Sequence, residues 1–198
     1  MKAIDSFRQN IVHARDLGSL YKALKSITTP ALSIDDILRS QIVMSVSALD
    51  HYVHEVVRQG ILSIFKGERP VVSGFKKFEV PLLEAKTSIT SESSTWLDAL
   101  IRHRHQFMSF QHPDKIADAI RLIHSEPLWP ALEARLGVPC RDLKEELKLI
   151  IDRRNKIAHE SDVDPSYPGS RWPITYGDAT HATDFIEELV EAIDVEVS

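Results

Sequence analysis

Apolar residues recur every three or four positions through most of this chain, a spacing typical of helices that bury one face. The first such stretch covers residues 3–27 and is interrupted at residues 28–30, Thr-Thr-Pro. Ser33 then has the features of a helix N-cap, with Asp36 three residues later. The second stretch continues to about Phe65, and at roughly 30 residues it predicts a helix long enough to span a domain.

The middle of the chain is less regular. Residues 66–94 contain several glycines and prolines and a Ser/Thr-rich run, which predict an irregular insertion with at most one short helix, near 80–86. A proline-rich loop at 161–177 precedes the last helical pattern. Further helical patterns cover about 94–107, 113–124, 129–136, 142–159 and 178 to the C-terminus.

Strand patterns are confined to two short segments beside prolines. We therefore expect a single all-α domain over residues 1–198, a bundle of about five to seven helices. In this bundle the long early helix is expected to pack against the helix at 142–159.

The composition narrows the class of protein. A single Cys excludes a disulfide within the chain, and the net charge of −5 means that binding of nucleic acid needs a locally basic site. Charges interrupt every apolar run, including the N-terminal one, so we expect no membrane span, no signal peptide and a cytoplasmic location. Because the chain contains no glycine-rich phosphate loop or dinucleotide fingerprint, no cofactor is expected.

One residue breaks the pattern of the helix at 142–159. Arg154 lies in the middle of its apolar face, and burial of an unpaired guanidinium is costly. Arg154 therefore has a buried acidic partner, reaches out of the face to solvent, or lies against a pocket or a second subunit. The apolar side chains of this face are Leu143, Leu147, Ile150, Ile151, Ile157 and Ala158.

Asn155 and His159 accompany Arg154 at the end of the same helix. This set suits the cleavage of RNA, which carries its own nucleophile in the 2′-hydroxyl. Histidine can act as acid or base and arginine can bind phosphate oxygens, so neither role requires a metal. Two copies of the site in a homodimer would supply both an acid and a base. The same spacing occurs at Arg8 and His13, but there the arginine lies beside an apolar face rather than within it.

The segment Arg153-Arg154-Asn155-Lys156-Ile157-Ala158-His159-Glu160 resembles the signature of the HEPN superfamily: an arginine, a polar residue, three variable residues and a histidine. Residues 47–57 on the long early helix resemble the corresponding helix of its RiboL-PSP branch. The resemblance implies a helical domain whose dimer cleft cleaves single-stranded RNA without a metal, with Arg154 and His159 as the catalytic pair and Asn155 at the polar position.

The resemblance also implies a setting for that activity: a toxin, or an effector of defence or RNA processing, with an antitoxin or regulatory protein as partner. Many members of the superfamily lack activity. The alternative is therefore a non-catalytic helical module that binds a partner within a defence complex.

A polar face on the long early helix carries three supporting candidates. Either this face is solvated or interfacial, or one of Asp50, His54 and Glu55 turns toward Arg154 and balances its charge, with Glu55 favoured if the two helices pack antiparallel. A zinc motif of the form His-Glu-x-x-His would need a second histidine at position 58. Arg58 occupies that position, so no metal site is expected.

Two other groups of cations have lesser expected roles. The basic tetrad at 102–105, Arg-His-Arg-His, is more consistent with a solvated helix face than with a contact to the RNA backbone. Arg153 lies about 100° around the helix from Arg154, so its replacement is expected to matter much less for cleavage.

Overall fold

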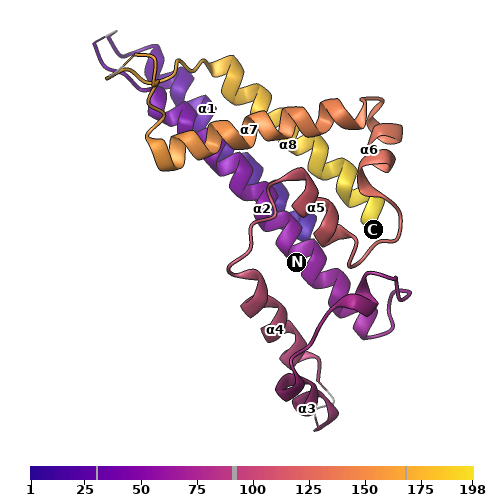
Figure 1. The fold of residues 1–198 in the computed structure, drawn as a ribbon. Coiled ribbons are helices and arrows are strands. Elements are labelled where there is room, and N and C mark those ends of the chain that lie inside the picture. Colours follow the sequence, from indigo (N-terminus) through magenta and orange to yellow (C-terminus); the bar gives the residue numbers. More distant parts are fainter. Residues whose placement is uncertain (30, 91–92, 168) are drawn as a thin grey trace.

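A computed structural model describes residues 1–29, 31–90, 93–167 and 169–198 (Figure 1). Within these ranges the chain forms eight α-helices and a short 3₁₀ helix, η1, and the β-pairing found there is an isolated bridge between Val163 and Arg171. The elements in chain order are α1 (Ala3–Lys25), α2 (Asp35–Phe65), η1 (Phe75–Lys77), α3 (Leu82–Thr90), α4 (Thr95–His105), α5 (Pro113–Ile120), α6 (Leu128–Leu136), α7 (Cys140–Glu160) and α8 (Tyr176–Val197).

The prediction of an all-α fold is confirmed, and the number of helices exceeds the expected range by one. The additional helix is α3, which corresponds to the one short helix that the sequence allows near 80–86 within the irregular segment 66–94. Pro81 directly precedes it, where the fixed φ of proline suits the start of a helix, and its carbonyl accepts a hydrogen bond from the Ala85 amide. Parts of three predicted features, the interruption at 28–30, the Ser/Thr-rich run and the proline-rich loop at 161–177, fall at residues 30, 91, 92 and 168, outside the described residues.

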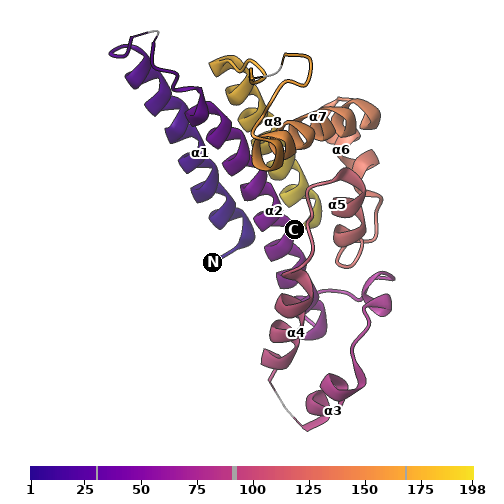
Figure 2. The same ribbon diagram turned by 60° about the vertical axis from the view of Figure 1, so that its left-hand side comes forward.

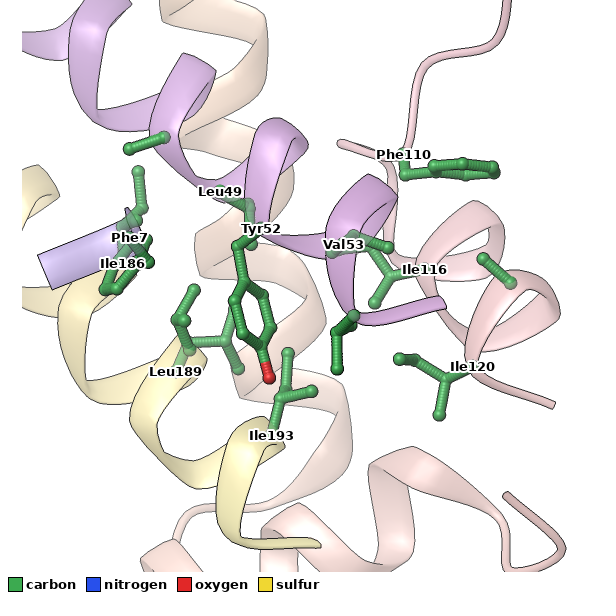
Figure 3. Packing of buried hydrophobic residues seen from close by; sticks show 14 of the residues in the cluster. Phe7, Leu49, Tyr52, Val53, Phe110, Ile116, Ile120, Ile186, Leu189 and Ile193 are labelled. Carbon is green, nitrogen blue, oxygen red and sulfur yellow. The ribbon is translucent and has the colours of Figure 1, made fainter. Parts of the chain in front are cut away.

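Three long helices, α1, α2 and α8, form a frame in which each packs against the other two. Phe7, Tyr52 and Ile186 come from one helix each and meet in the interior (Figure 3). The rings of Phe7 and Tyr52 pack edge to face with centroids 5.9 Å apart. The Tyr52 hydroxyl donates a hydrogen bond of 3.0 Å to Asp194, so the buried ring keeps its polar end satisfied.

Helix α7 lies across this frame and packs against α2, as the sequence predicts (Figures 1 and 2). Leu143, Leu147 and Ile150 are buried on its inner face. Helices α5 and α6 also pack against α7, and α6 packs against α8.

The segment between α2 and α5 forms a protrusion. Helix α4 packs against α2, and α3 packs against α4. Both views show α3 at the end of the molecule away from α7 (Figures 1 and 2). Among the described residues, no helix combines the length and the apolar character needed to cross a membrane.

Candidate active site

Full burial of the side chains along the inner face of α7 ends just before Arg154. The four apolar side chains before it are buried, whereas Ile157 is half-buried and Ala158 is exposed. Arg154 itself is half-buried. The predicted apolar face is therefore fully buried over only the first three turns or so of α7, and beyond Arg154 only Ile157 still packs against the core, in part.

The positive charge of the Arg154 guanidinium has few polar partners nearby. Its Nη1 donates a hydrogen bond of 3.0 Å to Oδ1 of Asn155. Its Nε is buried and has no hydrogen-bond partner, and no carboxylate of the described residues lies within 4.0 Å of it. Of the three environments expected from the sequence, a buried acidic partner is thus excluded for this part of the chain. An uncompensated buried donor costs free energy unless an acceptor reaches it.

His159 is exposed in the last turn of α7. It follows Arg154 by five residues, which in a helix places it roughly 7.5 Å along the axis and about 140° around it. Asn155, four residues before His159, is on the same side of the helix as the imidazole. One copy of α7 therefore directs Arg154 and His159 to different sides, and the exposed imidazole is free to exchange a proton with a bound molecule.

The chain turns sharply just after His159. Ser161 and Asp162 both adopt left-handed backbone conformations, with φ of 53° and 58°. The amide of Asp162 donates back to the carbonyl of Lys156, and its own carbonyl accepts from the Trp172 amide, each at 2.9 Å. These bonds close the end of α7 and tie it to the loop that leads to α8.

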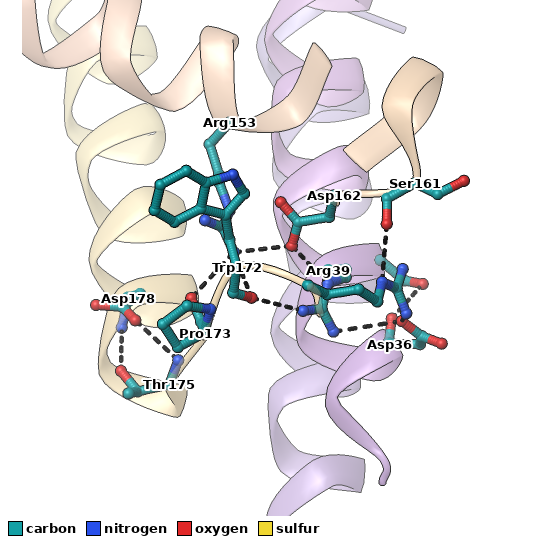
Figure 4. Close-up of polar contacts among 11 residues, drawn as sticks. Asp36, Arg39, Arg153, Ser161, Asp162, Trp172, Pro173, Thr175 and Asp178 are labelled. Atoms are coloured by element: carbon teal, nitrogen blue, oxygen red, sulfur yellow. Dashed lines mark hydrogen bonds and ion pairs between the residues drawn. The ribbon is translucent and has the colours of Figure 1, made fainter. Parts of the chain in front are cut away.

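A buried carboxylate fixes this turn to α2 (Figure 4). Asp162 is fully buried, and its Oδ2 accepts from Nε of Arg39 at 2.7 Å and from Nη2 of Arg153 at 2.8 Å. Both arginines also donate to the carbonyl of Trp172, and Arg153 donates to that of Pro173. We call Arg39, Arg153 and Asp162 the Asp162 cluster.

The sequence analysis did not predict the Asp162 cluster, and it assigned no structural role to Arg153. A signal was present in part: Arg39 directly follows Leu38 in the buried stripe of α2 and is itself buried. Its partner is 123 residues away in the sequence, beyond a turn that no helical periodicity reveals. Arg153 is therefore a structural residue that anchors the motif, whereas its neighbour Arg154 remains unpaired with any carboxylate of the described residues.

The expectation that Asp50, His54 or Glu55 balances Arg154 is not met. Glu55 instead accepts two hydrogen bonds from Nε and one from Nη2 of Arg58, at 2.7–3.2 Å, and Arg58 lowers the pKa of this carboxyl. Asp50 accepts from the amide of Phe110 at 2.6 Å. The reason is distance along α2, because the end of α7 is anchored at Arg39 and Glu55 lies 16 residues, roughly 24 Å, further on.

These three side chains line a separate cleft of about 590 Å³ between α2 and α4, together with Arg58 and members of the basic tetrad. We call it the α2–α4 cleft. The tetrad is not the uniform solvated face that was favoured: Arg102 and His103 are exposed, but His105 is buried against the rings of His54 and Phe110. Burial, with smaller contributions from His54 and Arg104, lowers the pKa of His105 to about 4.

The chain is thus an all-α bundle whose late helix carries an Arg-Asn-x-x-x-His motif near its C-terminal end. The RiboL-PSP-HEPN family model matches residues 13–198. The chain therefore belongs to the RiboL-PSP-HEPN family. No curated protein and no solved structure gives a match to it. HEPN domains are often ribonucleases, so membership favours a coarse assignment as an RNA-cleaving enzyme.

Proposed function

We propose that this protein is a metal-independent endoribonuclease that cleaves single-stranded RNA, with Arg154 and His159 as its catalytic residues. The observation that carries the proposal is the state of Arg154. Its cation has no carboxylate partner in the described residues and its Nε has no acceptor. A phosphate oxygen is the kind of acceptor that a forked guanidinium binds most strongly.

The reaction needs only groups that the motif and the substrate supply. The 2′-oxygen attacks the adjacent phosphorus, its proton passes to a base, and the bond from phosphorus to the 5′-oxygen breaks as an acid protonates that oxygen. His159 is suited to either proton transfer because an imidazole can act as an acid or as a base. Arg154 stabilises the charge on the phosphorane, and Asn155 orients the guanidinium through its hydrogen bond. The products carry a 2′,3′-cyclic phosphate and a 5′-hydroxyl.

The proposed enzyme is a homodimer whose two motifs share one groove. One chain supplies a single imidazole at the motif, and its Arg154 and His159 point about 140° apart. A second copy across a two-fold axis brings an acid, a base and two cations to the same phosphate, and such isologous contacts are the commonest form of oligomer.

Cleavage of labelled single-stranded RNA in EDTA tests the chemistry. Wild-type protein is expected to cut, His159→Ala and Arg154→Ala are expected to leave the RNA intact, and the new ends should be a cyclic phosphate and a 5′-hydroxyl. Products with a 5′-phosphate would contradict the mechanism, since they require water as the nucleophile. A well-folded wild-type protein that cleaves no RNA would favour the alternative, a non-catalytic module that binds a partner.

Co-expression of wild-type and His159→Ala chains tests the shared groove. If both subunits contribute to each site, mixed dimers are inactive and activity falls more steeply than the fraction of wild-type chains. A strictly proportional fall would show that each subunit cleaves alone.

The proposed biological role is that of a toxin or an effector of defence or RNA processing, held in check by an antitoxin or regulatory protein. Induced expression of the wild type is then expected to arrest growth, and expression of His159→Ala is not. Arrest by both would separate the growth effect from cleavage.

A further inference from the structure

The α2–α4 cleft is a second candidate binding site, and it lies on the same side of α2 as the C-terminal end of α7 (Figures 1 and 2). Its volume of about 590 Å³ is within the range of small-molecule pockets. Its walls offer both donors and acceptors, from the carboxylate of Glu55, the guanidinium of Arg102 and the imidazole of His103. A mixture of donors and acceptors is what the edge of a nucleobase requires.

Internal contacts hold this cleft in shape and pair two of its nearby acids, Glu55 and Asp98, with arginines. Arg58 bonds to Glu55 and, through Nη1, to Asp98 at 2.5 Å. Arg102 donates to Asp98 at 3.1 Å and lies 3.8 Å from Glu55. Two arginines thus compensate Glu55 and Asp98, whereas the third carboxylate, Asp50, accepts a hydrogen bond from the Phe110 amide at 2.6 Å and lies 3.8 Å from Nε2 of His54. Arg102 keeps more than half of its side chain exposed and can turn toward a ligand.

An exposed aromatic ring stands at the rim. Phe107 is 84% exposed, and its ring packs edge to face against that of His103, which lines the cleft. Met108, the next residue, lines the cleft and is 48% exposed. A large exposed ring beside a polar cleft is the arrangement on which unpaired bases stack.

The protrusion that forms one wall of the cleft is basic in an otherwise acidic chain. Residues 66–111 contain seven Lys and Arg and five Asp and Glu, a net charge of +2, whereas the whole chain carries −5. Lys76 and Lys77 are exposed there. This segment is thus the locally basic site that an acidic protein needs for binding nucleic acid.

The cleft is placed to bind the same strand as the motif. Figures 1 and 2 show α4 and the C-terminal end of α7 on the same side of α2. His54, in the wall of the cleft, lies 15 residues along α2 from Arg39, which anchors the end of α7, a separation of roughly 22 Å. An extended RNA strand crosses that distance in a few nucleotides.

We infer that the α2–α4 cleft binds one base of the RNA strand a few nucleotides from the cleaved bond, with Phe107 as stacking platform and Arg102 as contact to the neighbouring phosphate. This inference rests on the proposed ribonuclease function. It makes the cleft the part of the site that selects the sequence to be cut, since the motif itself contacts only sugar and phosphate.

Binding is measured in the His159→Ala background, where the strand stays intact. The probes are fluorescein-labelled RNA oligomers of about 8 nucleotides, one for each base, followed by fluorescence anisotropy. Phe107→Ala and Arg102→Ala are each expected to raise the Kd about fivefold or more and to reduce the preference among the oligomers. The matched controls are Tyr167→Ala and Arg141→Ala, whose side chains are exposed elsewhere, and these should bind within about twofold of the background protein.

The outcomes separate this inference from the proposed function. If the cleft variants bind RNA like the controls and the wild type cleaves RNA, base binding in the cleft is refuted and the proposed ribonuclease activity is not. If the cleft variants bind RNA more weakly and the wild type does not cleave RNA, binding in the cleft is supported and the proposed ribonuclease activity is refuted. Competition by free nucleoside monophosphates at the same concentration as the oligomer would overturn the assignment to an RNA strand.

Discussion

Replacement of Asp162 by Asn removes one charge from the centre of the Asp162 cluster and changes little else. Asn matches Asp in shape and tolerates the left-handed backbone that this position adopts, with φ of 58°. The effect on stability therefore measures the electrostatic contribution of the carboxylate, separately from that of the turn.

The expected loss is large because both ends of the main contact are buried. Asp162 is fully buried and the Arg39 side chain is 6% exposed, so the arginine cannot regain water when its partner is neutralised. Removal of one member of a buried ion pair costs about 3–5 kcal/mol. For a chain of this size each kcal/mol lowers the Tm by about 2–4 °C, so Asp162→Asn should melt roughly 6–20 °C below the wild type.

Thermal and urea unfolding followed by circular dichroism at the helical band check this prediction. Asp118→Asn is the matched control, because the Asp118–Arg121 pair is 64% exposed on both sides and should contribute under about 1 kcal/mol. The double variant Arg39→Met, Asp162→Asn should be no less stable than Asp162→Asn, since it leaves no unpaired arginine at position 39. An Asp162→Asn protein that melts within about 2 °C of the wild type would refute the reasoning.

Four further substitutions have expected outcomes that follow from the structure. Arg154→Ala should abolish cleavage and leave the Tm unchanged or slightly raised, while Arg153→Ala should lower the Tm through loss of its bond to Asp162; calorimetry on both proteins compares them. Because the pKa of His105 is about 4 in the folded state and near 6.5 in the unfolded chain, stability should fall as the pH drops from 6.5 toward 4, and His105→Gln should flatten that dependence in melts at several pH values. Tyr52→Phe should cost about 1 kcal/mol in urea unfolding, because it removes one buried hydrogen bond to Asp194 but leaves the ring in place.

The fold could be predicted because each long helix buries one continuous face. In α2 the apolar stripe alone locates the helix, and its buried residues run from Leu38 to Ile64. The sequence predicts α3 only as one short helix near 80–86, because prolines, glycines and a Ser/Thr-rich run surround it. Leu82 and Leu83, at its start, are both largely exposed. Its position depends on packing against α4 rather than on burial in the core.

The site could be predicted in part for the same reason. Arg154 stands out because a charge interrupts an apolar period, a feature that one helix is enough to show. Arg39 and Asp162 meet across 123 residues, and Glu55 is paired by Arg58 on its own helix rather than by Arg154. Which cation meets which carboxylate is decided by the crossing of α7 over α2, and periodicity along either helix contains no information about that crossing.

The two adjacent arginines of the motif explain why the structure can keep one of them unpaired. A half-buried guanidinium with a buried, unbonded Nε is unfavourable, and the last two turns of α7 could relieve it by fraying, as helix ends do. Arg153 prevents this, because its bond to Asp162 ties those turns to α2 through Arg39. The stability of the Asp162 cluster thus offsets the cost of the unbonded Nε of Arg154 and holds the guanidinium in place, as the proposed contact to a phosphate requires.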